Sequence, residues 1–200
     1  MVQANYPYLD LTVLPEIRPY VIASNAVLLF DPSLDSVLWA NGEGARLIGS
    51  GAVRSVLDGD VAPNATMMRQ IALAVEKLDD EEESSGMIRV RSGFRSRLLG
   101  ISARHLELPG GEKAVLLVSD SLHGRGHTTE AMARIAVDCL DGYGHASAIV
   151  GPDGALFAGS EHFNSLEVSE GQLSELVAEV ATETDRLVKR LIETRAGKMA

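Results

Sequence analysis

Histidines offer this chain its most versatile chemistry, and the sequence contains five. His123 and His127 are separated by three residues in "HGRGH", a spacing that can hold Zn²⁺ when it falls on a helix. The two intervening glycines disfavour a helix, and no nearby cysteine or carboxylate completes a tetrahedral set. We therefore interpret the segment as a linker. His105 ends a predicted strand, where a structural histidine is favoured over one that titrates in a pocket.

Signatures of kinases and hydrolases are missing from the sequence. The residue after each histidine is Leu, Gly, Thr, Ala or Phe, whereas a phosphoacceptor stretch of the form HE-x-x-x-P requires Glu. The short segments "GSG" and "HGRGH" lack the strand-to-helix context of a phosphate-binding loop. Ser50, in "IGSGA", lacks the preceding glycine of a nucleophile elbow. We predict that this chain is not itself an enzyme.

An acidic run from Asp79 to Glu83 is the remaining candidate for ion binding. Five consecutive acids project in different directions, so a solvated loop is favoured over a cation site. No metal site is predicted.

Composition restricts the class of protein further. The chain is 46% hydrophobic and 23% charged, as expected for one or two globular domains. Its net charge of -10 repels nucleic acids and anionic lipids, so we predict neither as a partner. Cys139 is the only cysteine, which suits a reducing compartment. No apolar stretch approaches the roughly 20 residues of a membrane span, and no export signal opens the chain, so the cytoplasm is the expected location.

The first 25 residues are predicted to form an extended arm and a short helix. Pro15 is placed as the first helical residue, and the helix is expected to run towards Ser24. Apolar residues follow close to helical spacing, which favours packing on the core and leaves contact with a second copy as the alternative. These candidate dimer residues are Leu14, Ile17, Tyr20 and Val21.

Residues 26–120 carry the pattern of one α+β domain. Val27 to Phe30, the turn "DPSLDS" and Ser36 to Ala40 predict a hairpin. A helix capped by Asn41 and ended by Gly49, a second short one at 53–57 and a third capped by Asn64 follow. Three more strands are predicted, at 87–91, 95–106 and 113–119, which gives a five-stranded antiparallel sheet with the helices on one face.

The second half repeats the start of this pattern. After a linker helix within 121–146, "ALFAG" at 155–159 corresponds to "VLWAN" at 37–41, and "GP" at 151–152 corresponds to "DP" at 31–32. A long amphipathic helix is predicted from Gln172 to Thr194, with no closing strands after it. Residues 147–200 are thus predicted to form an incomplete second copy of the first unit.

The segment from Leu28 to Gly49 resembles the PAS sensor family. The matching residues include Asn41 after the second strand and Leu47 and Gly49 at the end of the first helix. The resemblance covers Ala26 to Asp120 and, less completely, Ser147 to about Leu191. With the arm and the linker helix, the whole arrangement resembles the amino-terminal sensory region of bacterial multi-PAS sensor histidine kinases, in particular those that control cell division.

The resemblance implies a PAS fold, a parent protein that autophosphorylates on histidine with ATP, and a homodimer. It also implies downstream kinase domains, a response regulator or polar protein as a partner, and a location at the cell pole. Some PAS domains hold haem through a histidine on the connecting helix, which this chain lacks; Met67 or Met68 is a weaker alternative ligand. Light-sensing PAS domains attack flavin with a cysteine, and 26–120 has none. No cofactor is predicted.

The space between sheet and helices is the candidate ligand pocket, and a filled core is favoured over a bound apolar ligand. Its predicted lining residues are Leu29, Trp39, Leu47, Met67, Ile71, Leu99, Ile101, Val115 and Leu117. The sequence therefore predicts a sensory and dimerisation module that regulates kinase output through helix packing. A ligand-free scaffold for recruiting proteins is the alternative, and a stand-alone enzyme has the least support.

Overall fold

The computed structural model describes residues 6–61, 63–79, 82–92, 95–120, 128–141, 146–182, 192–194 and 197–199. The chain separates into two compact units, Met1–His127 and Thr128–Ala200. The predicted division at 25, 120 and 146 stays a prediction, and each unit is described by itself below.

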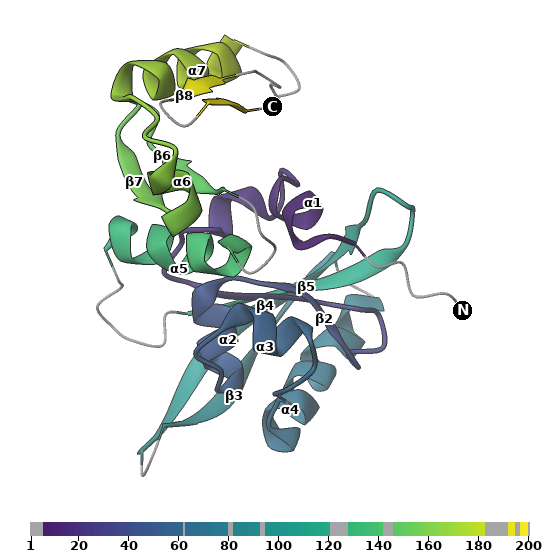
Figure 1. Ribbon diagram of the computed structural model, residues 1–200. Coiled ribbons are helices and arrows are strands. Elements are labelled where there is room, and N and C mark those ends of the chain that lie inside the picture. Colours follow the sequence, from purple (N-terminus) through teal and green to yellow (C-terminus); the bar gives the residue numbers. More distant parts are fainter. Residues whose placement is uncertain are drawn as a thin grey trace. The chain divides into compact units, whose positions relative to one another are not determined.

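A five-stranded antiparallel sheet forms the frame of the first unit, as the sequence predicts (Figure 1). Its strands lie in the order β2-β1-β5-β4-β3. Their bounds are β1 Ala26–Phe30, β2 Val37–Ala40, β3 Glu83–Ser92, β4 Arg95–Glu107 and β5 Lys113–Ser119. The helices between β2 and β3 are α2 Gly42–Ile48, α3 Val53–Leu57, α4 Ala65–Val75 and the 3₁₀ helix η2 Glu76–Asp79.

The helices α2, α3 and α4 lie on one face of this sheet, and α1 (Tyr8–Thr12) lies on the opposite face (Figure 1). Because side chains alternate along a strand, the register assigns each strand residue to one of these faces. Leu28 pairs with Leu117 and lies under α2, whereas its neighbour Leu29 pairs with Leu116 on the α1 side. We call these the helix face and the α1 face.

The helix α4 also covers the edge strand β3. The Gln70 side-chain oxygen accepts a hydrogen bond from the backbone N–H of Arg89 at 2.8 Å, and Ser84 Oγ donates to the carbonyl of Ala74. The first bond occupies a backbone N–H of β3, a group that an edge strand otherwise leaves open to pairing with another chain, and the second holds the Ser84 side chain on α4.

The N-terminal helix differs from the prediction. The only α-helix within the described residues 6–25 is α1, and the segment predicted as a helix from Pro15 to Ser24 consists of turns and the 3₁₀ helix η1 Arg18–Tyr20. Pro19 explains the difference, because a proline in the fifth position of a helix removes a backbone donor and clashes with the preceding turn.

The second unit begins with α5 Thr129–Asp141, which packs on a hairpin of β6 Ala148–Val150 and β7 Leu156–Gly159. It continues with α6 Glu161–Ser165, α7 Glu170–Thr182 and a hairpin of β8 Ile192–Thr194 and β9 Gly197–Met199. The predicted helix from Gln172 to Thr194 is thus wrong at its end, where β8 forms, and 183–191 lie outside the described residues. Strands do follow α7, contrary to the prediction.

Candidate functional site

The nine residues predicted to line a pocket are all buried, but the sheet separates them. Leu47, Met67, Ile71, Leu99, Ile101, Val115 and Leu117 belong to the helix face or to the helices that cover it. Leu29 and Trp39 are directly opposite each other in register on the α1 face. The nine therefore do not line one cavity. The reason is the pleat of the sheet: Leu28 and Ala40, the neighbours of Leu29 and Trp39, are the ones that face the helices.

A hollow of about 510 Å³ lies on the α1 face, where the strands β3, β4 and β5 are adjacent. Small or polar residues line much of it, including Ser85, Gly100 and Ser102. Of the nine predicted residues, Ile101 alone lines it. The sequence pattern did not predict this hollow, because it arises from small side chains that the register of three paired strands brings together on one face.

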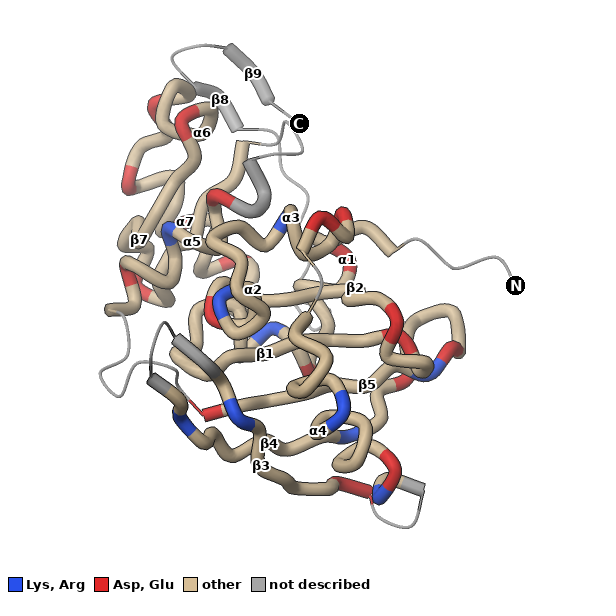
Figure 2. The backbone as a smooth tube through the Cα atoms, turned by 90° about the horizontal axis from the view of Figure 1, so that it is seen from below, with Lys and Arg blue, Asp and Glu red and all other residues tan. Residues whose placement is uncertain are grey.

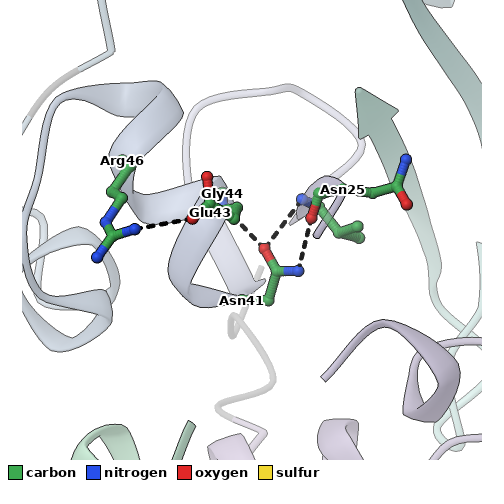
Figure 3. Close-up of polar contacts among 6 residues, drawn as sticks. Asn25, Asn41, Glu43, Gly44 and Arg46 are labelled. Carbon is green, nitrogen blue, oxygen red and sulfur yellow. Dashed lines mark hydrogen bonds and ion pairs between the residues drawn. The ribbon is translucent and has the colours of Figure 1, made fainter. Parts of the chain in front are cut away.

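Asn41 connects the first hairpin to α2, as Figure 3 shows. Its Oδ1 accepts hydrogen bonds from the N–H groups of Gly44 at 2.8 Å and Val27 at 3.1 Å. Its Nδ2 donates to the carbonyls of Asn25 at 2.8 Å and Tyr20 at 2.9 Å. Asn41 is 1% exposed, so these four bonds form away from water and fix the start of α2 against β1 and the preceding turn.

Gly44 and Glu43 complete this contact. A Cβ atom on Gly44 would overlap the carbonyl oxygen of Val27, so only glycine lets α2 approach β1 this closely. Glu43 is 1% exposed and forms an ion pair with Arg46 at 2.8 Å (Figure 3). The sequence predicts Asn41 as a helix cap, but it does not reveal the long-range partners of its side chain.

Ser160 makes an equivalent contact in the second unit. Its Oγ accepts from the N–H of Phe163 at 3.1 Å and of Ser147 at 3.2 Å, as Asn41 Oδ1 accepts from Gly44 and Val27. The backbone bonds match too, because Ser160 N donates to Ser147 O and Asn41 N donates to Val27 O.

Both hairpins also share an irregular register. One shifts between Leu29 and Phe30 and the other between Ile149 and Val150, so each carries a bulge at the same step before its helix. The repeat predicted from sequence therefore extends to backbone detail. In the described residues the sheet of this hairpin has two strands, and a second PAS-like unit stays a prediction.

The N-terminal arm is held on the α1 face by polar contacts at buried positions. Trp39 Nε1 donates to Thr12 Oγ1 at 2.9 Å, and Tyr8 Oη donates to the carbonyl of Ala40 at 3.0 Å. The rings of Tyr8 and Trp39 stack with their centroids 5.8 Å apart. Tyr8, Thr12 and Trp39 are all buried, so α1 is part of the core of the first unit rather than a loose extension.

Tyr6 fastens the start of the arm to the turn between β4 and β5. Its hydroxyl donates to Glu112 Oε2 at 2.5 Å and accepts from the N–H of Gly110 at 3.0 Å. The bond from Tyr6 lowers the pKa of the Glu112 carboxyl, and the same bond raises the pKa of the Tyr6 hydroxyl. The attachment is therefore sensitive to pH at both extremes.

The candidate dimer residues differ in exposure. Ile17 is fully buried within the first unit, whereas Leu14, Tyr20 and Val21 are partly exposed. Burial of Ile17 agrees with the favoured interpretation of core packing and leaves three of the four side chains accessible.

The candidate chemical groups are not gathered into a reactive site in the described part of the chain. His105 is exposed at the end of β4, and His123 and His127 lie outside the described residues. Among the residues that the structure describes, no three His, Cys, Asp or Glu side chains are grouped to hold a metal ion. Nor does this part of the chain contain a helix long and apolar enough to cross a membrane. What the described residues do offer is packing, a hollow and polar contacts between elements.

The first unit has the PAS fold that the sequence predicts: an α+β domain with two strands, a group of helices and three further strands in one antiparallel sheet. No family model matches the sequence. Among solved structures, a PAS domain from a two-component sensor histidine kinase is 17% identical, with 52% of this chain and 93% of that chain covered at a TM-score of 0.40. A light-oxygen-voltage domain is 15% identical, with 57% and 89% covered at 0.42.

More specifically, the chain is similar in sequence to part of the cell-division control histidine kinases PdhS. It is 32% identical over 194 residues to PdhS of Brucella anthropi, which is 97% of this chain and 17% of that kinase. It is 30% identical over 190 residues to PdhS of Brucella canis and of Brucella abortus, which is 95% of this chain and 18% of each kinase. The resemblance to cell-division kinases is therefore confirmed, and the chain spans less than a fifth of these relatives.

Proposed function

We propose that this chain is the sensory and dimerisation region of a two-component histidine kinase, and that it regulates the output of kinase domains elsewhere in its parent protein. One observation carries the proposal: the similarity extends over 97% of this chain but only 17% of a named histidine kinase. The residues of this chain then supply packing and binding, while autophosphorylation on histidine with ATP belongs to the rest of the parent.

The contacts of the first unit support a mechanism based on helix packing. The buried Asn41 connects α2 to β1, and Trp39 connects β2 to α1, so both faces of one hairpin are coupled to helices. A ligand or partner that binds one arrangement of these helices better than another shifts the population between the two. Such a shift is the signal that we propose for the kinase.

The partners and location follow from the same proposal. We assign a homodimer, a response regulator as the recipient of phosphate, with the cell-division regulator DivK as the particular candidate, and a cytoplasmic position at the cell pole. We assign no haem or flavin, because α4 has no histidine and the only cysteine of the chain, Cys139, lies outside the first unit. Bound flavin or haem would absorb light above about 350 nm. An absorption spectrum of the purified chain without bands in that range supports this assignment.

A ligand screen tests the sensor against the scaffold. The interior between the sheet and α2–α4 stays predicted as a filled core, with an apolar ligand as the alternative. We expect a saturable rise in melting temperature with a metabolite if the region senses a small molecule, since a ligand that binds only the folded state stabilises it. A flat profile across cofactors and metabolites favours the scaffold that recruits another protein.

A further inference from the structure

Part of the α1 face on β3 and β4 remains exposed and apolar. Met87 is 54% exposed and Leu98 is 56% exposed, which are high values for large apolar side chains. Both belong to the same face, because Met87 is opposite Gly100 in register and Leu98 is opposite Arg89. We call the surface formed by Met87, Arg89, Leu98, Gly100 and Asp120 the open face.

Shape is the first property of the open face that suggests a partner. The hollow of about 510 Å³ lies directly beside the exposed Met87 side chain. It exists because Ser85, Gly100 and Ser102 contribute little volume on this side of β3 and β4. A flexible apolar side chain thus protrudes next to a depression of suitable size to receive one.

Charge is the second property. Arg89 is exposed on the edge strand β3, and Asp120 is exposed just after β5, two strands away and in register with Gly100. Basic residues lie along β3 and β4 (Figure 2). Among the residues that the structure describes, neither Arg89 nor Asp120 belongs to an ion pair; Asp120 Oδ2 accepts from Gly100 N at 3.2 Å. Opposite charges therefore stand at opposite corners of the open face.

We propose that the open face binds the open face of a second copy of this chain through a two-fold axis. A rotation that exchanges Arg89 with Asp120 brings each arginine to the aspartate of the second copy. The same rotation carries Met87 across β3 towards the second copy's hollow beside Gly100. One surface thus carries the protruding Met87 and the hollow that can receive it, and also the basic Arg89 and the acidic Asp120. A self-complementary interface requires such pairs on the same surface.

A different protein with an acidic or apolar surface would not require the open face to carry both Arg89 and Asp120, or both Met87 and the hollow. An acidic partner would use Arg89 and be repelled by Asp120, whereas a second copy satisfies both charges. This interface deepens the dimer of the proposed function, and it uses a surface separate from the predicted dimer residues Leu14, Ile17, Tyr20 and Val21.

Sedimentation equilibrium of the full chain over a range of concentrations tests the proposal. We expect the wild-type chain to dimerise and Met87→Asp to weaken the dimer at least tenfold. The matched control is Leu73→Asp, since Leu73 is 60% exposed on α4, which covers the other face of the sheet. It should leave the dimerisation constant unchanged. Circular dichroism confirms that each variant is folded.

Charge exchange makes the test specific for this geometry. Arg89→Glu and Asp120→Lys should each weaken self-association, because each places like charges in contact. An equimolar mixture of the two variants should form a heterodimer close to wild-type strength, since the introduced glutamate would then meet the introduced lysine while the remaining Arg89 and Asp120 still pair. Arg69→Glu, on α4, is the control for a change in net charge.

Three results would overturn the inference: a monomeric wild-type chain, a dimer that resists all three open-face variants, or a mixture of charge variants that associates no better than either alone. If the dimer persists in the variants, the interface is wrong but the dimer of the proposed function stands. Regulation of the kinase is measured separately by autophosphorylation, so a failure of that function is distinguishable from a failure of this interface.

Discussion

The Asn41 side chain uses both of its polar atoms fully, with two hydrogen bonds accepted and two donated at a buried position. A buried amide is stable only when its bonds are made, so these four partners also restrict the residue type. Aspartate would cap α2 equally well but has no donor for the carbonyls of Tyr20 and Asn25.

Replacing Asn41 by alanine is expected to lower the free energy of unfolding by about 2–4 kcal/mol, because it removes a cap and leaves buried backbone groups unsatisfied. Urea denaturation measures the change. Asn64→Ala is the matched control, since Asn64 caps α4 at an exposed position with a single bond to Thr66 N, and about 1 kcal/mol is expected there. Equal losses in the two variants would contradict the role that we assign to Asn41.

Gly44 tests the close approach of α2 to β1. Gly44→Ala should destabilise the fold by about 2 kcal/mol or more, because the new methyl group overlaps backbone rather than a movable side chain. Gly51→Ala is the control, since a Cβ atom there meets nothing within 4 Å. Thermal unfolding of both variants gives the comparison, and a Gly44→Ala protein as stable as Gly51→Ala would show that α2 is free to move away.

The N-terminal arm illustrates how contacts between elements add pH dependence. Because the pKa of Glu112 is lowered, its bond to Tyr6 is complete above the ordinary glutamate pKa and is lost as pH falls through the lowered value. Because the pKa of Tyr6 is raised, the bond persists below the ordinary tyrosine pKa of 10.0 and is lost as pH rises through the raised value. The arm should therefore be most firmly attached between these limits.

Limited proteolysis of the arm across pH measures this attachment. We expect protection near neutral pH and faster cleavage at both extremes in the wild-type chain. Glu112→Gln should abolish the acid limb, and Tyr6→Phe should make cleavage fast at every pH. Cleavage of wild-type and Tyr6→Phe chains at the same rate at pH 7 would show that the contact does not hold the arm.

Buried contacts of α1 can be followed through a single fluorophore, since Trp39 is the only tryptophan. Thr12→Val removes the acceptor for Trp39 Nε1 and should cost about 1–3 kcal/mol, because a buried donor is left without its bond. A red shift of Trp39 emission at lower urea than in the wild-type chain is the expected sign. Coincident transitions in the two proteins would mean that the Trp39–Thr12 bond adds no stability.

The elements of the first unit were largely predictable from sequence, since capping residues, turns and apolar periodicity are local signals. Asn41, Gly49 and Asn64 mark helix ends at the expected places, and β5 has the predicted bounds. The helix after Pro15 was not correctly predicted, because the apolar spacing there outweighed Pro19. Ile17 is buried although its segment consists of turns, so the apolar spacing there reflects packing on the core and not a helix.

The candidate pocket shows what local signals do not contain. Burial of all nine residues agrees with their apolar character, but their division between two faces depends on register, and a shift of one residue reverses the face of every side chain. The hollow near Gly100 depends on three strands together. The register between paired strands is therefore the information that the sequence pattern lacked.

At the scale of the whole molecule, the chain combines a complete PAS unit with a second unit that repeats its hairpin, bulge and capped helix. Asn41 is equivalent to Ser160, and Val27 is equivalent to Ser147, which indicates an internal structural repeat. Ser160 has no amide donor, so the second unit lacks the bonds that Asn41 makes to Asn25 and Tyr20. The similarity to PdhS covers both units, so the two units together correspond to one stretch of those kinases.

Autophosphorylation of the full-length parent protein tests the central claim most directly. The rate of phosphate incorporation from ATP would be compared between the wild-type protein, a protein lacking these 200 residues and a protein carrying Thr12→Val. We predict that phosphorylation persists without this region but changes several-fold, and that Thr12→Val shifts it in the same direction, because the region controls rather than performs the chemistry. Identical rates in all three proteins, or no parent kinase activity at all, would contradict this account.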